Sequence, residues 1–154
     1  MKSKIRFAGL AMMSVMAVLG STIVLRADQQ QQLELRARQN KQINGFEAEL
    51  RGDYRERPGR DRLNAELEKI NLPAGTPVAF CLVHGGASSV IGVADVVKVG
   101  GVLHAQIELE GEEGASVPTV KAGDLLQAHQ RTTAPFNENP TCGSPQLLSA
   151  PFQK

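Results

Sequence analysis

The chain has 154 residues, with 17 lysines and arginines against 16 aspartates and glutamates, and aromatic residues make up only 4% of it. Four of the basic residues and none of the acidic ones lie in residues 1–27, so residues 28–154 carry 13 positive and 16 negative charges, a net of −3. This balance argues against a nucleic-acid partner, which would need basic residues gathered on one face. The scarcity of aromatic rings argues against a sugar site that stacks rings.

The first 27 residues have the order of an export signal. A basic start is followed by residues 7–25, which contain no charge, and then by Ala27, a small residue at a possible cleavage point. The apolar run is also long enough to span a bilayer, so an uncleaved anchor is the alternative. Both interpretations predict an exported protein, periplasmic or extracellular, which touches the membrane only through residues 7–25 if these are kept.

Residues 28–32 form a glutamine-rich tether, and residues 33–154 have the length of a single domain with one core. Apolar and polar residues alternate along three segments of this domain, Leu33–Gln39, Phe46–Tyr54 and Leu103–Glu110. A period of two is typical of antiparallel strands with one buried and one wet face. With 15 glycines and 8 prolines marking turns, the sequence predicts an all-β fold, a small antiparallel β-sandwich or barrel-like domain.

The densest charged stretch is residues 51–62, which we interpret as a solvated hairpin with its tip at Pro58-Gly59. Its alternating charges would discourage pairing between exposed sheet edges. It contains the tripeptide Arg51-Gly52-Asp53, which continues the strand pattern and is not expected to act as an adhesion loop. Residues 63–72 fit either a strand or a helix, and we predict a strand because turn signals bound them closely.

Residues 77–83, PVAFCLV, are apolar at every position, which is typical of a central strand buried on both faces. Cys81 lies here, three residues before His84. In an exported chain, the pair Cys81 and Cys142 predicts a disulfide. The alternative, a Cys81 nucleophile activated by His84, needs both side chains on one face, whereas residues three apart on a strand point to opposite faces.

The remaining segments predict short strands and loops. Residues 88–99 read as one or two short strands bent at Gly92, and residues 111–124 as a loop with Val117 and Val120 pointing inward. Residues 125–130 and 147–152 read as the last two strands.

Three turn signals recur in an order that resembles a known pattern. They are Ile43-Asn44-Gly45, the LPAGT of residues 72–76 and the VPTVKAGD of residues 117–124. This order resembles a recurrent small exported bacterial all-β domain of unknown function, over Ile43 to about His129. The resemblance implies an all-β fold and a strand over Leu63–Leu72. It implies no activity and no catalytic residues, and the two cysteines are not part of it.

Metal binding is the second function that the sequence leaves open. His84, His104 and His129 each fall on a predicted strand and could meet at one zinc site, although no two of them share a short metal-binding motif. Glu108, Glu110, Glu112 and Glu113 could supply oxygen ligands to calcium, or form a solvated strand end. The chain has neither a G-x-S-x-G elbow nor a phosphate-binding glycine loop, so no catalytic residue and no cofactor is predicted.

We therefore expect an exported, non-catalytic module that binds an unknown protein or envelope surface partner through a sheet face, an edge or its turn loops. The alternative is a metal-binding protein or metal-dependent enzyme that uses the histidines or the Glu108–Glu113 cluster.

Overall fold

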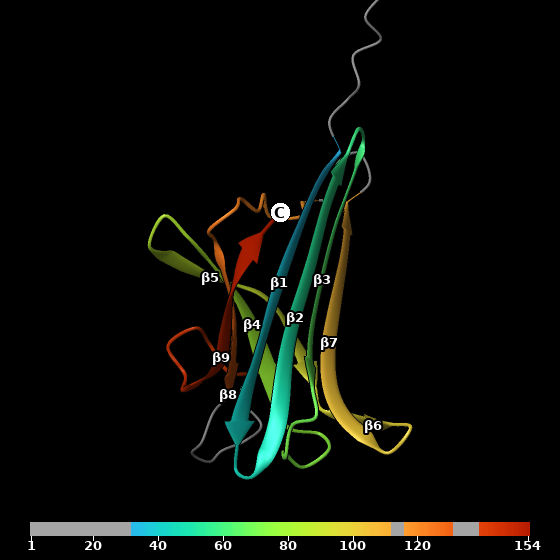
Figure 1. Ribbon diagram of the computed structural model, residues 1–154, viewed down its shortest axis with the longest axis vertical. Helices are drawn as coiled ribbons and strands as arrows, with labels where there is room; N and C mark the ends of the chain where they lie inside the picture. Colours follow the sequence, from blue (N-terminus) through green and yellow to red (C-terminus); the bar gives the residue numbers. More distant parts are fainter. Residues whose placement is uncertain (1–31, 112–115, 131–138) are drawn as a thin grey trace, which may run out of the picture.

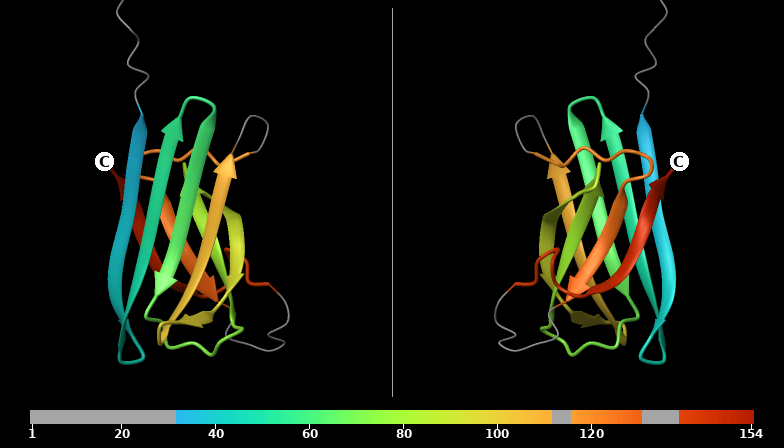
Figure 2. Two further views of the ribbon diagram at one scale, coloured as in Figure 1. Left: turned by 90° about the vertical axis from the view of Figure 1, so that its right-hand side faces the viewer. Right: turned by 90° about the vertical axis from the view of Figure 1, so that its left-hand side faces the viewer.

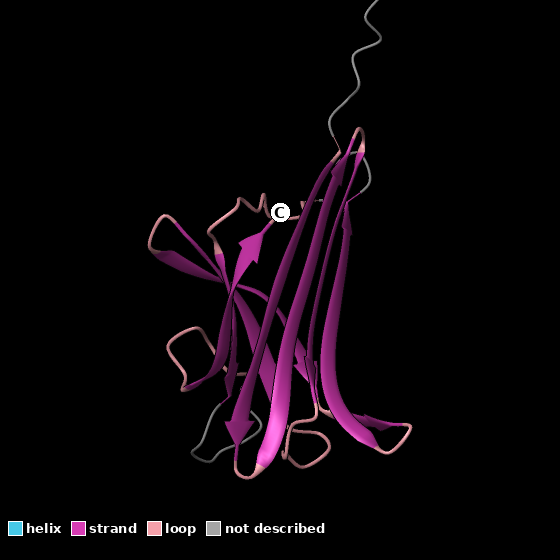
Figure 3. Cartoon of the chain, viewed as in Figure 1, coloured by secondary structure: helices cyan, strands magenta, loops and turns pink. Residues whose placement is uncertain are grey.

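A computed structural model describes residues 32–111, 116–130 and 139–154, and every regular element in these ranges is a β-strand (Figure 3). The strands are β1 Leu33–Ile43, β2 Phe46–Arg57, β3 Arg60–Glu68, β4 Pro77–His84, β5 Ala87–Asp95, β6 Val97–Val99, β7 Val102–Gly111, β8 Leu125–Gln130 and β9 Gln146–Gln153. Within these ranges no helix is long and apolar enough to cross a membrane. The predicted signal or anchor, residues 1–27, and most of the predicted tether lie outside the described residues.

The strands form one curled antiparallel sheet in the order β5-β4-β8-β9-β1-β2-β3-β7-β6. Figures 1 and 2 show that the sheet folds over at β1 and β9 into two layers, with β1, β2, β3 and β7 in one and β4, β5, β8 and β9 in the other. The join is short, because β1 pairs with β9 only at Arg36–Gln153 and Ala37–Phe152. The all-β, sandwich-like prediction is confirmed.

The core lies between the two layers and follows from the alternation in the sequence. Along β2, β3 and β7, side chains at every second position are buried or half-buried in the core, and most of their neighbours reach solvent. The inward-facing set includes Leu35, Leu50, Tyr54, Leu63, Leu67, Phe80, Leu82, Leu126, Leu148 and Phe152, all at most 3% exposed. Val117 and Val120 pack against this core as predicted, Val120 with no exposed surface.

Two glycines mark places where the layers approach each other closely. A Cβ atom on Gly52 would lie 2.7 Å from Leu126 Cδ2 and 3.0 Å from Phe152 Cζ, both across the core. A Cβ atom on Gly92 of β5 would lie 2.9 Å from Ile107 Cδ1 on β7. Gly52 is therefore a packing residue, consistent with the expectation that Arg51-Gly52-Asp53 is no adhesion loop.

The hairpin expected over residues 51–62 is formed by β2 and β3, which turn at Pro58-Gly59. The reason proposed for its charges is wrong. Neither strand is an edge, because β1 and β7 flank the pair within the sheet, so there is no edge pairing for the charges to prevent.

β3 ends at Glu68, short of the strand predicted to reach residue 72. Lys69 adopts a left-handed backbone conformation with φ 55°, which turns the chain out of the sheet. Ile70 is then buried at 2% exposure, and Leu72 packs against the core without belonging to the strand.

β4 is buried on both faces as predicted, but it is not central in the sheet, since only β5 lies beyond it. Its inner face contributes Phe80 and Leu82 to the core, while Ala79 and Cys81 on the other face are fully buried. The register with β5 is irregular at Phe80–Cys81, opposite Gly92, where a bend was expected.

Candidate functional site

Cys81 and Cys142 form a disulfide with a Cα–Cα distance of 5.9 Å. Cys81 has no exposed surface, and its sulfur is bonded, so it is not a nucleophile for His84. The disulfide prediction is confirmed. Such a bond indicates an oxidising compartment outside the cytoplasm.

His129 helps to fix the segment that carries Cys142. It pairs with Ala79 of β4 in the register and is only 3% exposed. Its Nδ1 lies 2.7 Å from the carbonyl oxygen of Ser144, to which it donates, and its Nε2 lies 3.1 Å from the side-chain oxygen of Gln127. The hydrogen bond to Ser144 therefore ties β8 to the segment that carries Cys142.

His84 ends β4 beside Asp124, which precedes β8. The Nδ1 atom of His84 lies 2.9 and 3.0 Å from the two carboxylate oxygens of Asp124, and the second oxygen also accepts the backbone N–H of Lys121 at 2.8 Å. Asp124 is buried, whereas the His84 side chain is half exposed. The sequence assigned Asp124 only to a turn, so this partner of His84 was missed.

His104 lies on the outer face of β7, opposite Glu68, and is far along the sheet from β4 and β8. Glu108 and Glu110, on the same face, form ion pairs with Arg62 and Arg60. Glu112 and Glu113 lie outside the described residues. No group of three potential metal ligands occurs within the described ranges, so the structure provides no support for the metal alternative, which stays a prediction.

Glu49 is the most enclosed carboxylate on the outer face of β2, with a side chain only 3% exposed. Arg51 donates two hydrogen bonds to it, at 2.8 and 2.9 Å, and Arg38 of β1 lies 2.5 Å from the same carboxylate. The hydrogen bonds from Arg51 lower the pKa of Glu49, and the burial of the group opposes this shift only in part. The carboxylate thereby links β1 and β2 across their outer face.

We expect Glu49→Gln to lower the free energy of unfolding at pH 7 by about 1–2 kcal/mol, since charge-assisted hydrogen bonds are lost. Because the pKa of Glu49 is lower in the folded state, its contribution is present above the ordinary glutamate pKa of about 4.3 and is lost as the pH falls through the folded-state pKa. Urea unfolding of both proteins between pH 7 and pH 3 checks this. The difference should shrink at low pH, and a constant difference would contradict the assignment.

The backbone of β1 faces β2 and β9 at alternate residues. Asn44 and Gly45 form a two-residue turn with φ 51° and 81°, so the flanking pair Ile43–Phe46 is hydrogen-bonded. Odd-numbered residues of β1 therefore direct their N–H and C=O groups toward β2, and even-numbered residues direct theirs to the other side.

The hydrogen bonds of β9 show independently which of its residues face β1. The N–H of Phe152 donates to Asp124, and its C=O accepts from Gly123, so Phe152 faces the β8 side. The adjacent Gln153 therefore faces β1, where it pairs with Arg36.

Beyond that join the pairing of β1 with β9 ends. Since the β1–β9 register ends at Ala37, the even-numbered Arg38, Asn40 and Gln42 direct backbone groups into space that no strand of the described residues fills. Pro151 on the other side has no N–H to leave unpaired. The result is a partly open β-strand edge.

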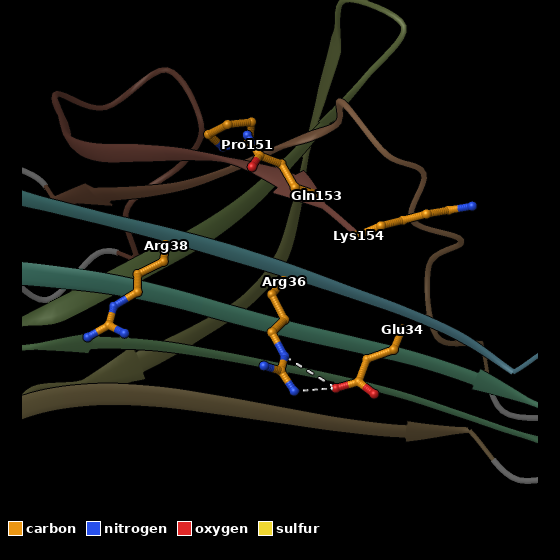
Figure 4. Close-up of a pocket in the computed structure, with 6 residues that line it drawn as sticks. All are labelled: Glu34, Arg36, Arg38, Pro151, Gln153 and Lys154. Atoms are coloured by element: carbon orange, nitrogen blue, oxygen red, sulfur yellow. Dashed lines mark hydrogen bonds and ion pairs between the residues drawn. The ribbon is translucent and has the colours of Figure 1, made fainter.

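A groove of about 480 Å³ lies over the β1–β9 join and is lined by Glu34, Arg36, Arg38, Pro151, Gln153 and Lys154 (Figure 4). It meets the unpaired edge at Arg38, whereas Asn40 and Gln42 do not line it. The side chains of Arg36 and Arg38 are 70% and 66% exposed. Glu34 is the one acidic lining residue, and Arg36 donates to it at 2.8 Å. The groove therefore adjoins the unpaired strand edge at Arg38 and has more basic than acidic lining residues.

Sequence reasoning did not find this groove, because nothing in the alternation of β1 shows where β9 leaves it. Comparison with known proteins found no matching family model, no similar curated protein and no similar solved structure.

Proposed function

We propose that the protein is an exported, non-catalytic binding module that holds an extended segment of a partner protein by adding it as a strand in the β1–β9 groove. The observation that carries the proposal is the alternation of β1, which leaves Arg38, Asn40 and Gln42 with backbone groups that no described strand pairs, continuing from the groove at Arg38. Backbone pairing supplies affinity in strand addition, and side chains along the edge supply specificity.

The charges of the groove favour an acidic segment. Arg36, Arg38 and Lys154 outnumber Glu34 among its charged lining residues. A peptide strand added to β1 would place alternate side chains on the outer face, beside the exposed guanidinium groups of Arg36 and Arg38. Carboxylates at those positions would form charge-assisted hydrogen bonds.

Export is part of the proposal. The Cys81–Cys142 disulfide supports an oxidising compartment, and the order of basic, apolar and small residues in positions 1–27 supports a secretory route. We propose a periplasmic or extracellular location, with residues 7–25 as the membrane contact if they are retained.

A proline at position 40 tests the groove. Asn40→Pro removes an N–H on the unpaired edge of β1 and leaves the β1–β2 hydrogen bonds in place. The probe is a fluorescein-labelled octapeptide of alternating glutamate and threonine with blocked ends, titrated into the purified full chain by fluorescence anisotropy. We expect the wild-type protein to bind it and Asn40→Pro to bind at least about tenfold more weakly, a loss of about 1.4 kcal/mol.

Asn40→Ala is the matched control, since it removes the same side chain and keeps the backbone donor. It should bind within about twofold of wild type, and a peptide of alternating lysine and threonine should not bind. Equal binding by Asn40→Pro and Asn40→Ala, with both proteins folded by circular dichroism, would refute strand addition at this edge.

A further inference from the structure

Four arginines gather at the tip of the β2–β3 hairpin. Arg55 lies directly opposite Arg62, and Arg57 directly opposite Arg60, and all four side chains are on the outer face of the sheet. Like charges in directly opposed positions of an antiparallel pair destabilise it. The tip thus holds two unfavourable cross-strand pairs side by side.

Neighbouring carboxylates balance this charge only in part. Glu110 lies 3.1 Å from Arg60 and 3.6 Å from Arg62, and Glu108 forms an ion pair with Arg62. Arg55 lies 3.7 Å from Glu34, which Arg36 already holds at 2.8 Å.

Arg57 has no acidic partner within ion-pair distance among the described residues. Its contact there is the amide of Gln32, whose oxygen, when turned toward Arg57, accepts at 3.2 and 3.3 Å. The guanidinium groups line a small pocket of about 120 Å³ together with Glu110.

These four arginines lie together at one end of the outer face of β2 and β3. Farther along the same face, β2 and β3 carry three carboxylates, Glu49, Glu66 and Glu68, around one arginine, Arg51. Burial raises the pKa of Glu66, and the neighbouring Glu68 adds to the effect. Residues 55–62 carry four arginines against Glu56 and Asp61, so the hairpin tip has a net positive charge on a domain whose net charge is negative.

The chain enters the domain at this same end. Leu33, the first residue of β1, pairs with Glu56, next to the β2–β3 turn, as Figure 1 shows. Residues 26–32 alone separate the apolar run 7–25 from β1, and seven residues span at most about 25 Å. A bilayer that held residues 7–25 would lie within that distance of the arginine tip.

We propose that Arg55, Arg57, Arg60 and Arg62 bind the anionic headgroups of the bilayer in which residues 7–25 are embedded, so that the domain stands with its hairpin tip on the membrane. Guanidinium groups bind phosphate oxygens in bidentate fashion, and each basic residue near an anionic surface adds to the attraction. Lipid phosphates would supply the counter-charge that the two arginine pairs lack. The proposal takes from the proposed function only the membrane-embedded form of residues 7–25.

Hydrogen–deuterium exchange of the full chain in lipid nanodiscs tests this contact. We expect amides 55–62 to exchange at least about threefold more slowly in nanodiscs with 30% phosphatidylglycerol than in pure phosphatidylcholine, because only the former carries net negative charge. The protection should disappear at 0.5 M salt, where charges are screened. It should also be absent when 10 mM inorganic phosphate is added to neutral nanodiscs.

The variant Arg55→Gln with Arg57→Gln should lose the protection. Its Tm should not fall, since one member of each like-charged pair is removed. The matched control is Lys41→Gln with Lys98→Gln. It removes two positive charges at the end of the sheet away from the hairpin tip, and it should keep the protection.

Equal exchange in both lipids, protection by phosphate in neutral nanodiscs, or unchanged protection in the arginine variant would each overturn the proposal. Exchange at residues 38–42 reports on the groove separately, so failure at the hairpin tip and failure at the groove can be told apart.

Discussion

Replacing both cysteines, Cys81→Ala with Cys142→Ala, should lower the free energy of unfolding by about 4 kcal/mol. The two residues are 61 positions apart, and the chain-entropy model assigns this amount to a loop of that length. For a single domain this is a large share of the total stability. Urea unfolding monitored by circular dichroism measures the loss, and the Tm should fall by roughly 10–20 °C.

Reduction provides the control for that substitution. Wild-type protein in dithiothreitol should unfold at the urea midpoint of the double-alanine variant, and the variant itself should not respond to dithiothreitol. If the free energies of unfolding of the double variant and the oxidised wild type differed by less than about 1 kcal/mol, the disulfide would not be a main source of stability.

Phe152→Ala should cost about 3–5 kcal/mol, the range for truncating a fully buried aromatic side chain. The ring of Phe152 lies against Gly52 across the core, and its backbone pairs with Ala37 at the short join of β1 and β9. Its loss therefore opens a cavity at the place where the two layers meet. Chemical denaturation of the variant measures this cost.

Phe46→Ala is the matched control, because Phe46 is 52% exposed at the β1–β2 turn. Its truncation should change stability by less than about 1 kcal/mol. Similar losses for the two phenylalanines would show that the core does not lie between the layers as described.

The fold was predictable because period-two alternation reports directly which face of a strand is buried. Leu35 and Ala37 of β1, and Ala105 and Ile107 of β7, are buried as their positions indicate. The disulfide was predictable because two cysteines in an export context have one simple interpretation.

The end of β3 was not predictable from the same pattern. Ile70 and Leu72 are apolar residues that suit a strand, and the turn depends on a left-handed conformation at Lys69, a residue type that seldom adopts it. Similarly, the partnership of His84 with Asp124 depends on how β4 and β8 are placed side by side, 40 residues apart in sequence.

The groove and the arginine tip were hidden for related reasons. The alternation of side chains shows which face of a strand is buried. It does not show which neighbouring strand the backbone groups of a residue face, or where the pairing with that strand ends. β1 and β9 also come from opposite ends of the domain. The arginines of residues 51–62 were visible, but their opposition in two like-charged pairs depends on the hairpin register.

Amide exchange at single residues of β1 tests the central claim most directly. On addition of the glutamate–threonine octapeptide, exchange of the amides of Arg38, Asn40 and Gln42 should slow markedly, since no described strand pairs with them on the β9 side. Those of Gln39 and Lys41, which β2 already protects, should not change. Such an even–odd difference is the result this account predicts. Unchanged exchange at all five residues, although the peptide binds, would contradict it.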